Sequence, residues 1–331
     1  MIRPGPRNLI TDLDGIKVGN ADDAALRSGT TVLLPDRPMA MAVDVRGGAP
    51  GTRDTEALSA DTLVERFHAL VLSGGSVFGL AAADGVTGWL SERGIGLQLG
   101  PRAVPVVPAA ILFDLRNGGD KAWDENPYPA LGRAACEAAS RDFPLGNVGA
   151  GVGAKAGSLK GGLGSASAFA EGGLQAGALV GANPFGEAVM PDGTFWAWPL
   201  ELDGELGGRA PGVLERPLPD GFPPGPPPVS NTVIAAVAVN LPLDKAQAKR
   251  VAMMAQDGIA RAVRPAHTPF DGDTVFAVAT GALDREVTPR LLAEAGALAA
   301  DCLARAIARA VLAAEPLGGK PSWRQLYGRS D

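Results

Sequence analysis

Residues 216–240 read RPLPDGFPPGPPPVSNTVIAAVAVN and join a proline-rich segment to an apolar one. The first part, Arg216–Pro228, holds seven prolines in thirteen residues, which predicts an extended, exposed segment that cannot enter a sheet. The apolar run Val233–Val239 predicts a buried strand, and such a strand needs neighbours. We therefore expect the C-terminal part to complete a sheet begun before the linker. The alternative, a plain linker between two domains, predicts that residues 232–331 fold alone.

Short runs of β-forming residues between Gly-rich turns predict further strands. They lie at Thr30–Leu34, Ala40–Val45, Ala69–Leu72, Ala109–Phe113, Ala178–Ala182 and Thr274–Ala279. Apolar spacing and capping residues predict helices at Val77–Arg93, Asp244–Val263 and Pro289–Ala314. This mixed order favours layers of helices and sheets, α/β or α+β, over a sandwich of strands alone.

The composition excludes several classes of partner. Gly and Pro number 45 and 28 of 331 residues, below the share of about 25–30% that marks low-complexity chains, so we expect a compact fold with many turns. The net charge is −6 and no basic patch stands out, which argues against nucleic acid and anionic membranes as partners. The N-terminus lacks the apolar region of a signal peptide, and the apolar runs are too short to span a membrane. We expect a soluble, cytoplasmic protein.

Cysteine and histidine are scarce in this chain. Cys136 and Cys302 form no CxxC pair, so we expect neither a disulfide framework nor a structural zinc site. Two histidines, His68 and His267, argue against a multi-histidine metal site. We expect no metal and no cofactor.

Ser230, Asn231 and Thr232 stand where the linker meets the buried strand. A threonine there can serve simply as a β-former. It can also be an N-terminal nucleophile: the Thr232 hydroxyl attacks the Asn231 carbonyl, an ester forms, and its hydrolysis frees the Thr232 α-amine. An α-amine titrates near ~7.7–8.0, so it can act as the base for its own hydroxyl without a histidine.

The run HTPFDGDT, residues 267–274, carries two carboxylates around one glycine. Asp271 and Asp273 fit an ordinary tight turn. They also fit an acidic pair that orients or charges the amine of a nucleophile, in which case the two like charges can raise one of the two pKa values.

Three Gly-rich segments carry other candidate groups. Leu72–Gly79, LSGGSVFG, has Phe78 where the GxSxG nucleophile elbow needs its last glycine, so an α/β-hydrolase site is unsupported. Lys160 in KGGLGS is by default a surface charge, although it can also approach a reaction centre. Asn183 in GANPFG is by default a turn residue, although it can donate to an oxyanion.

Taken together, these segments resemble the L-aminopeptidase/D-esterase (DmpA-like) peptidase family, which includes β-peptidyl aminopeptidases and nylon-oligomer hydrolases. The resemblance covers nearly the whole chain. It rests on NLITDLDGIKVG (8–19), VDVRGGAPGTRDTEAL (43–58), LSGGSVFGLAAADGV (72–86), KGGLGSAS (160–167), SNT (230–232) and the HTPFDGDTVFA run.

The resemblance implies a four-layer α-β-β-α sandwich similar to N-terminal nucleophile hydrolases, with the strand connectivity of the DmpA and ornithine acetyltransferase folds. It implies one catalytic domain, 1–331, that cleaves itself into chains 1–231 and 232–331, with residues 216–230 as an exposed linker before the cut. The chains stay together and assemble into larger homo-oligomers. Thr232 then corresponds to the nucleophile, and the enzyme hydrolyses amide or ester bonds of short peptides or amino-acid amides.

Further residues correspond to functional positions of the family. Asn183 matches its oxyanion-hole asparagine. Lys160, Asp271 and Asp273 resemble the catalytic lysine and acidic pair of the nylon-hydrolase branch, whereas the β-peptidyl branch has Ser and Glu at the two acidic positions. Phe113 stands where members commonly carry an active-site tyrosine, so that phenol hydroxyl is missing.

Two other functions fit the same motifs. An acyltransferase of the ornithine acetyltransferase type would pass the acyl group to an amine instead of water. A non-catalytic binding protein would keep the scaffold and remain uncleaved.

Overall fold

Strand β11 (Thr232–Val239) lies at the centre of the fold, and all of its side chains are buried. Val233, Val237 and their alternate neighbours face one apolar core, whereas Ile234, Ala236 and Ala238 face another. Burial on both faces explains why the strand reads as an unbroken apolar run. The computed structural model describes residues 1–212 and 231–328, so the expected linker 216–230 lies outside the described residues.

The first sheet has the strand order β3-β12-β11-β10-β9. Its other members are β3 (Ala40–Val45), β12 (Thr274–Ala279), β10 (Gln175–Asn183) and β9 (Gly162–Phe169). Strands β11 and β12 are parallel to each other, and every other pair is antiparallel. The two C-terminal strands thus lie between strands from the N-terminal part, as predicted from the buried run after the linker.

The second sheet has the order β1-β2-β5-β6-β4. Its strands are β1 (Ile16–Asp23), β2 (Ser28–Pro35), β5 (Leu70–Ser73), β6 (Ala109–Ile111) and β4 (Thr52–Arg53). Only β5 and β6 run parallel, so both sheets are mixed.

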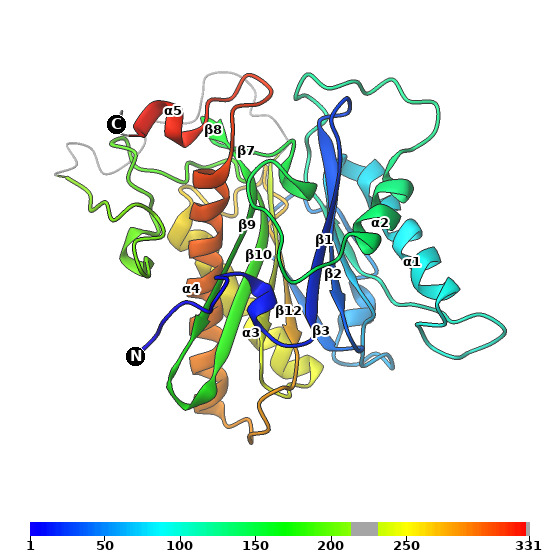
Figure 1. Ribbon diagram of the computed structural model, residues 1–331. Helices are drawn as coiled ribbons and strands as arrows, with labels where there is room; N and C mark the ends of the chain where they lie inside the picture. Colours follow the sequence, from blue (N-terminus) through cyan, green and yellow to red (C-terminus); the bar gives the residue numbers. More distant parts are fainter. Residues whose placement is uncertain (213–230, 329–331) are drawn as a thin grey trace.

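Helices cover the outer face of each sheet (Figure 1). The long helices α3 (Lys245–Ala262) and α4 (Pro289–Ala313) pack on the first sheet, and α1 (Ala82–Glu92) and α2 (Tyr128–Glu137) pack on the second. Side chains cap the starts of both helices, because Asp244 before α3 and Thr288 before α4 accept the N–H groups of Gln247 and Leu291. The resulting order of layers is α-β-β-α, as expected.

Three apolar cores separate these four layers. The one between the two sheets joins residues far apart in sequence, among them Val18, Leu72, Leu179 and Phe276. No helix within residues 1–212 and 231–328 is both long enough and apolar enough to cross a bilayer.

The seven predicted strands and three predicted helices are present, with ends that shift by a few residues. The helix expected at Val77–Arg93 begins as a 3-10 turn, η3 (Ser76–Ala81), before α1. Strand β9 was not predicted, because its sequence GLGSASAF is rich in small residues and favours a turn. Its glycines are packing positions: a Cβ on Gly164 would lie 2.0 Å from the Ala306 carbonyl oxygen in α4.

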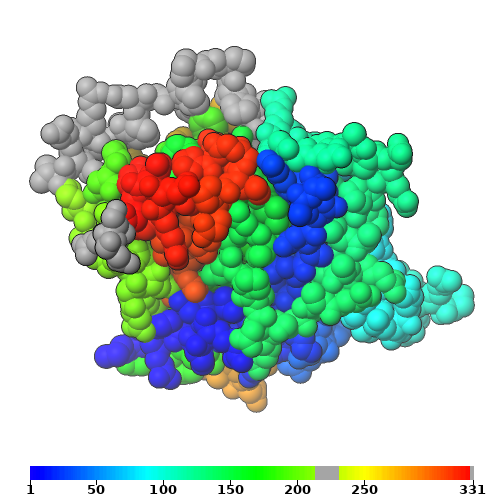
Figure 2. Space-filling view, turned by 45° about the horizontal axis from the view of Figure 1, so that its top comes forward, coloured from blue at the N-terminus to red at the C-terminus, as the bar shows by residue number. Residues whose placement is uncertain are grey.

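The C-terminal segment lies on the surface against the middle of the chain. Figure 2 shows this segment in red beside green residues. Lys160 N–H donates to the Pro321 carbonyl at 2.8 Å, and Lys320 Nζ donates to the Gly157 carbonyl at 2.8 Å. These bonds hold it over the short strands β7 (Lys155–Ala156) and β8 (Leu159–Lys160), near one end of β10.

Candidate active site

Thr232 and Asn183 lie directly opposite each other in the first sheet. Thr232 is the first residue of β11 and Asn183 the last of the antiparallel strand β10, and the register pairs the two. Directly opposed residues have Cβ atoms about 4.5–5.5 Å apart. Both side chains are buried, with Thr232 only 4% exposed. Strand pairing therefore brings the predicted nucleophile and the predicted oxyanion donor together.

The peptide carbonyl before Thr232 receives two hydrogen bonds. The Thr232 hydroxyl donates to the Asn231 carbonyl oxygen, and the Gly272 N–H donates to the same oxygen at 3.0 Å. A parallel bridge between Asn231 and Asp271 fixes the two segments side by side. Donors on a carbonyl oxygen stabilise the negative charge that develops there when a nucleophile attacks its carbon.

The Gly272 position tolerates little besides glycine. A Cβ there would lie 2.9 Å from Thr232 Oγ1 and 2.6 Å from the Ala49 carbonyl oxygen. Gly272 was not predicted as a site residue, although it is the glycine between the two acids of the DGD pattern.

The Asn183 amide is held by backbone groups on both of its sides. Its Oδ1 accepts the Lys155 N–H at 2.9 Å, and its Nδ2 donates to the Phe113 carbonyl oxygen at 3.4 Å. These contacts set which end of the amide is the donor, so a role in oxyanion binding is compatible with its fixed orientation.

Asp273 lies in the acidic loop, residues 267–273, and bonds this loop to the strand that begins at Thr232. One carboxylate oxygen accepts the Val233 N–H at 2.9 Å. The other accepts the His267 N–H at 3.1 Å and lies 2.8 Å from His267 Nδ1. No site role was predicted for His267, although this residue stands in the same HTPFDGDT run as Asp273.

Asp271 ties the same loop to the exit of β10. Its Oδ1 accepts the Phe185 N–H at 2.9 Å, and its Oδ2 accepts both the N–H and the hydroxyl of Thr268. Burial, and next the negative charge of Asp273, raise the pKa of Asp271. The two aspartates therefore form a buried, coupled pair at the predicted site, rather than a solvated turn.

The segment after β3 braces this acidic loop. The Arg46 N–H donates to the Asp273 carbonyl at 3.0 Å, and the Ala49 N–H donates to that of Asp271 at 2.8 Å. This contact gives a structural role to the RGGAPG motif, whose position follows from the pairing of β3 with β12.

Lys160 lies near this site, but its ammonium points to backbone groups. It is 1% exposed, and its Nζ donates to the carbonyls of Gly151 and Gly161 at 3.0 and 2.8 Å. Burial lowers its pKa to about 7, against an opposing effect of the Asp114 charge. Its cross-strand partner is Lys155, whose N–H binds Asn183. Lys160 is thus connected to the site through β7, and within the described residues its ammonium bonds the Gly151 and Gly161 carbonyls rather than Thr232.

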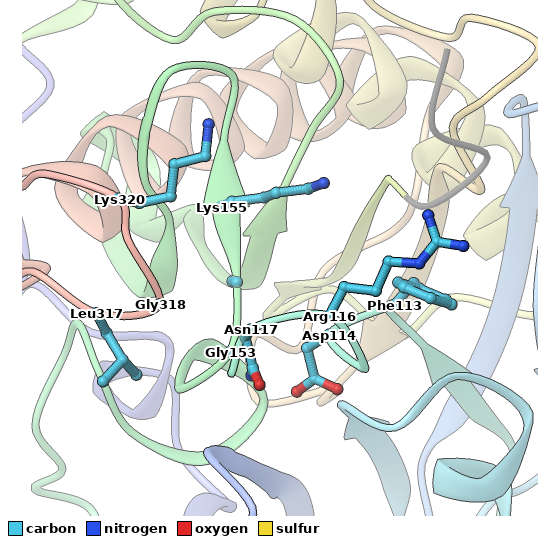
Figure 3. Close-up of a pocket in the computed structure, with 10 residues that line it drawn as sticks. Phe113, Asp114, Arg116, Asn117, Gly153, Lys155, Leu317, Gly318 and Lys320 are labelled. Atoms are coloured by element: carbon cyan, nitrogen blue, oxygen red, sulfur yellow. The ribbon is translucent and has the colours of Figure 1, made fainter. Parts of the chain in front are cut away.

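A cavity of about 150 Å³ lies near the site, between the segment after β6 and strand β7 (Figure 3). Phe113 and Lys155, the two residues that bind the Asn183 amide through their backbones, both line it. The phenyl ring at position 113, where the resemblance implies a tyrosine, therefore belongs to the wall of a cavity beside the site.

The sequence matches a known family over most of its length. The model of peptidase family S58 matches residues 8–323. The chain is 44% identical to an uncharacterized aminopeptidase of Mycobacterium tuberculosis, over 97% of this chain and 98% of the relative. It is 32% identical to a 6-aminohexanoate-oligomer endohydrolase of Agromyces sp., over 86% of this chain and 78% of that protein.

Solved structures share the fold. A β-aminopeptidase of Burkholderia sp. superimposes with a TM-score of 0.75 at 24% identity, covering 99% of this chain and 94% of the other. The L-aminopeptidase D-Ala-esterase/amidase of Ochrobactrum anthropi, described as a new variant among the Ntn hydrolase fold, gives 0.70 at 24% identity, covering 96% and 89%. The expected fold, an Ntn-hydrolase-like sandwich of the DmpA type, is confirmed. The family match and the close relatives show that the chain belongs to peptidase family S58, as its ordered motifs indicate.

Proposed function

We propose that this protein is an aminopeptidase that cuts its own chain between Asn231 and Thr232 and then hydrolyses amide or ester bonds of short peptides through Thr232. One observation carries the proposal: the buried Thr232 hydroxyl lies against the carbonyl of the preceding residue, whose oxygen also receives the Gly272 N–H. Family membership supports the hydrolase class, since relatives bear the names aminopeptidase and oligomer endohydrolase.

The self-cleavage follows from this geometry. Thr232 Oγ1 attacks the Asn231 carbonyl carbon, and the Gly272 N–H stabilises the oxyanion. The C–N bond breaks, the hydroxyl proton passes to the departing nitrogen, and an ester joins Asn231 to the threonine oxygen. Water then cleaves the ester, which leaves a carboxylate on Asn231 and a free amine and hydroxyl on Thr232. The products are chains 1–231 and 232–331.

In the mature site the same Thr232 hydroxyl attacks a substrate. The free Thr232 amine accepts the proton of its own hydroxyl while the oxygen attacks the substrate carbonyl, and the Asn183 amide donates to the new oxyanion. Asp271 and Asp273 place negative charge near the amine. The acyl-enzyme is released by water. Lys160 acts as a positioning residue, because β8 pairs with the strand that fixes Asn183.

A denaturing mass spectrum tests the first half of this proposal. We expect the 33.6 kDa chain to be replaced by two species, the smaller beginning at Thr232. An assay of short peptides and amino-acid amides tests the second half, and a parallel assay with an added amine separates a hydrolase from an acyltransferase. An uncleaved chain without activity would favour the non-catalytic binding protein, and an uncleaved but active chain would overturn the assignment of Thr232.

A further inference from the structure

The two histidines of this chain have different surroundings. His68 is 4% exposed and bonds only backbone: its N–H donates to the Val106 carbonyl, and its Nδ1 accepts the Val106 N–H, both at 3.0 Å. The polar contacts of His267 go instead to one carboxylate. Asp273 Oδ2 accepts the His267 N–H at 3.1 Å and lies 2.8 Å from the ring Nδ1. One histidine thus joins backbone segments, whereas the other contacts a residue of the candidate site.

The His267 ring has no second polar contact in the part of the chain that the structure describes. Its Nε2 is buried and has no hydrogen-bond partner among those residues. Asp273 carries the negative charge that raises the pKa of Asp271, and an ionised carboxylate only accepts hydrogen bonds, so Nδ1 is the donor. A buried nitrogen without a partner costs free energy, as does the positive φ of 55° at this residue. The contact with Asp273 is therefore what explains a histidine at this position.

The other oxygen of Asp273 anchors the strand that carries Thr232. It accepts the Val233 N–H at 2.9 Å, one residue beyond the proposed nucleophile. The main chain of Asp273 is also fixed, because its carbonyl accepts the Arg46 N–H at 3.0 Å. A carboxylate is planar, so the two donors that His267 places on one oxygen also set the direction of the other. His267 thus acts on the start of β11 through Asp273.

This anchor matters more once the chain is cut. In the intact chain a backbone bridge to Asp271 holds Asn231, which in turn holds Thr232 through the peptide bond. Cleavage between Asn231 and Thr232 removes this hold, and Thr232 becomes the free end of β11. The bond between Val233 and Asp273 then lies next to that end. Loss of the anchor should therefore affect the mature site more than the self-cleavage.

We propose that His267 is a positioning residue of the mature enzyme, which holds the Asp273 carboxylate so that the free end at Thr232 stays in place for attack on a substrate. The inference rests on the proposed function and adds to it a residue that acts through another. The role of the imidazole is to direct a carboxylate, and no proton transfer to or from the substrate is assigned to it.

Two substitutions separate the donor from the backbone conformation. Glycine adopts a positive φ without strain and asparagine often does, so His267→Gly and His267→Asn both suit this position. Only asparagine carries a donor nitrogen on Cγ, where histidine carries Nδ1. In His267→Gly we expect kcat of the processed enzyme to fall about tenfold with KM within about twofold, and self-cleavage to slow less than about threefold. His267→Asn should retain most of the wild-type kcat.

Steady-state hydrolysis of a short peptide, the time course of cleavage by denaturing mass spectrometry, and thermal unfolding measure these effects. His68→Ala is the matched control, since it removes the other histidine of the chain and should lower stability with kcat retained. A second measurement repeats His267→Gly in an Asp273→Asn background. There it should change kcat less than about twofold, because the charge that His267 binds is gone.

Wild-type kcat in His267→Gly would overturn the inference, and so would equal losses of kcat in His267→Gly and His267→Asn. Full additivity with Asp273→Asn, or an equal loss of kcat in His68→Ala, would also contradict it. If the wild-type protein neither cleaves itself nor hydrolyses peptides, the proposed function fails first and the inference falls with it. A wild-type protein that does both, matched by His267→Gly, defeats only the role of His267.

Discussion

Both sheets contain one parallel strand pair, and a buried aspartate joins the ends of each pair. In the second sheet, Asp114 follows β6 and accepts the Gly75 N–H just beyond β5. In the first sheet, Asp273 precedes β12 and accepts the Val233 N–H at the start of β11. A carboxylate–N–H bond thus connects the two parallel strands in both sheets. It lies at the carboxyl ends of β5 and β6 but at the amino ends of β11 and β12.

The hydroxyl groups beside the two aspartates differ in what they contact. Near Asp114, the Ser28 hydroxyl donates to the carboxylate and accepts the Tyr128 hydroxyl proton at 2.9 Å, so the group is used for packing. Near Asp273, the Thr232 hydroxyl lies on a peptide carbonyl that another N–H polarises. A buried carboxylate at a strand end therefore does not by itself indicate catalysis. A hydroxyl placed against a polarised carbonyl does, because it is a nucleophile beside an activated carbon.

The largest effect is expected at the hydroxyl that makes this difference. Thr232→Ala should abolish self-cleavage and lower hydrolysis by roughly 10³-fold or more, because no other group replaces a lost nucleophile. Thr30→Ala is the matched control, a buried threonine of the second sheet whose hydroxyl bonds Ser73 at 2.8 Å. Denaturing mass spectra and peptide assays of both variants check this prediction. Hydrolysis by an uncleaved Thr232→Ala chain would place the nucleophile elsewhere.

Two buried asparagines at opposite ends of the β10–β11 pair allow the next comparison. Asn183→Ala should lower kcat of the processed enzyme by about 10²–10³-fold, the usual loss for one oxyanion donor. Asn240 accepts the Gln175 N–H at 2.9 Å and donates to Gly173 at 2.8 Å, so Asn240→Ala should cost stability with kcat retained. Steady-state kinetics and thermal unfolding separate the two outcomes. Equal losses of kcat would show that Asn183 is only a structural asparagine.

Gly272→Ala should slow self-cleavage by about 10²-fold, since displacing a reacting group by about 1 Å can cost that much. The added Cβ would lie 2.9 Å from Thr232 Oγ1 and would push the hydroxyl or the loop aside. Gly88→Ala in α1 is the control, because a Cβ there meets nothing within 4 Å and should stabilise the helix by about 0.5–1 kcal/mol. The time course of cleavage after expression measures the effect. Normal cleavage in Gly272→Ala would show that a side chain at this position does not displace the Thr232 hydroxyl.

Much of this arrangement follows from local sequence signals. The run Val233–Val239 predicts a doubly buried strand, and the linker before it predicts that Thr232 stands at the start of that strand. The family motifs predict the four layers, and they mark Asn183 and the two aspartates as site residues. Their convergence depends on the register between β10 and β11, which lies outside the reach of local patterns.

Other features were not predictable because they depend on an unusual backbone conformation or on non-local contacts. His267 contacts Asp273 across a turn with a positive φ of 55° at His267, a conformation that residues other than glycine seldom adopt. Strand β9 reads as a turn, because the reason for its glycines is a helix more than a hundred residues away. The cavity of Figure 3 is lined by residues from three distant segments, and local sequence patterns do not bring these segments together.

The last expected effect concerns stability rather than activity, at the buried lysine Lys160. The pKa of Lys160 is about 7 in the folded protein, against 10.5 for an ordinary lysine. Between these values the unfolded chain binds a proton that the folded chain does not, so the free energy of unfolding rises with pH by up to about 1.4 kcal/mol per unit. Below pH 7 the lysine is protonated in both states, and its contribution is flat.

Denaturant unfolding of the wild-type protein and Lys160→Met, from below pH 7 to above it, measures this slope. The difference in free energy between the two should rise in favour of the wild type above about pH 7. Lys17→Met, at an exposed pair, should give no such slope. Because the Asp114 charge raises the pKa of Lys160, Asp114→Asn should move the onset of the slope to lower pH. An unmoved onset would mean that Asp114 is protonated beside Lys160 and that this aspartate of the second sheet only packs.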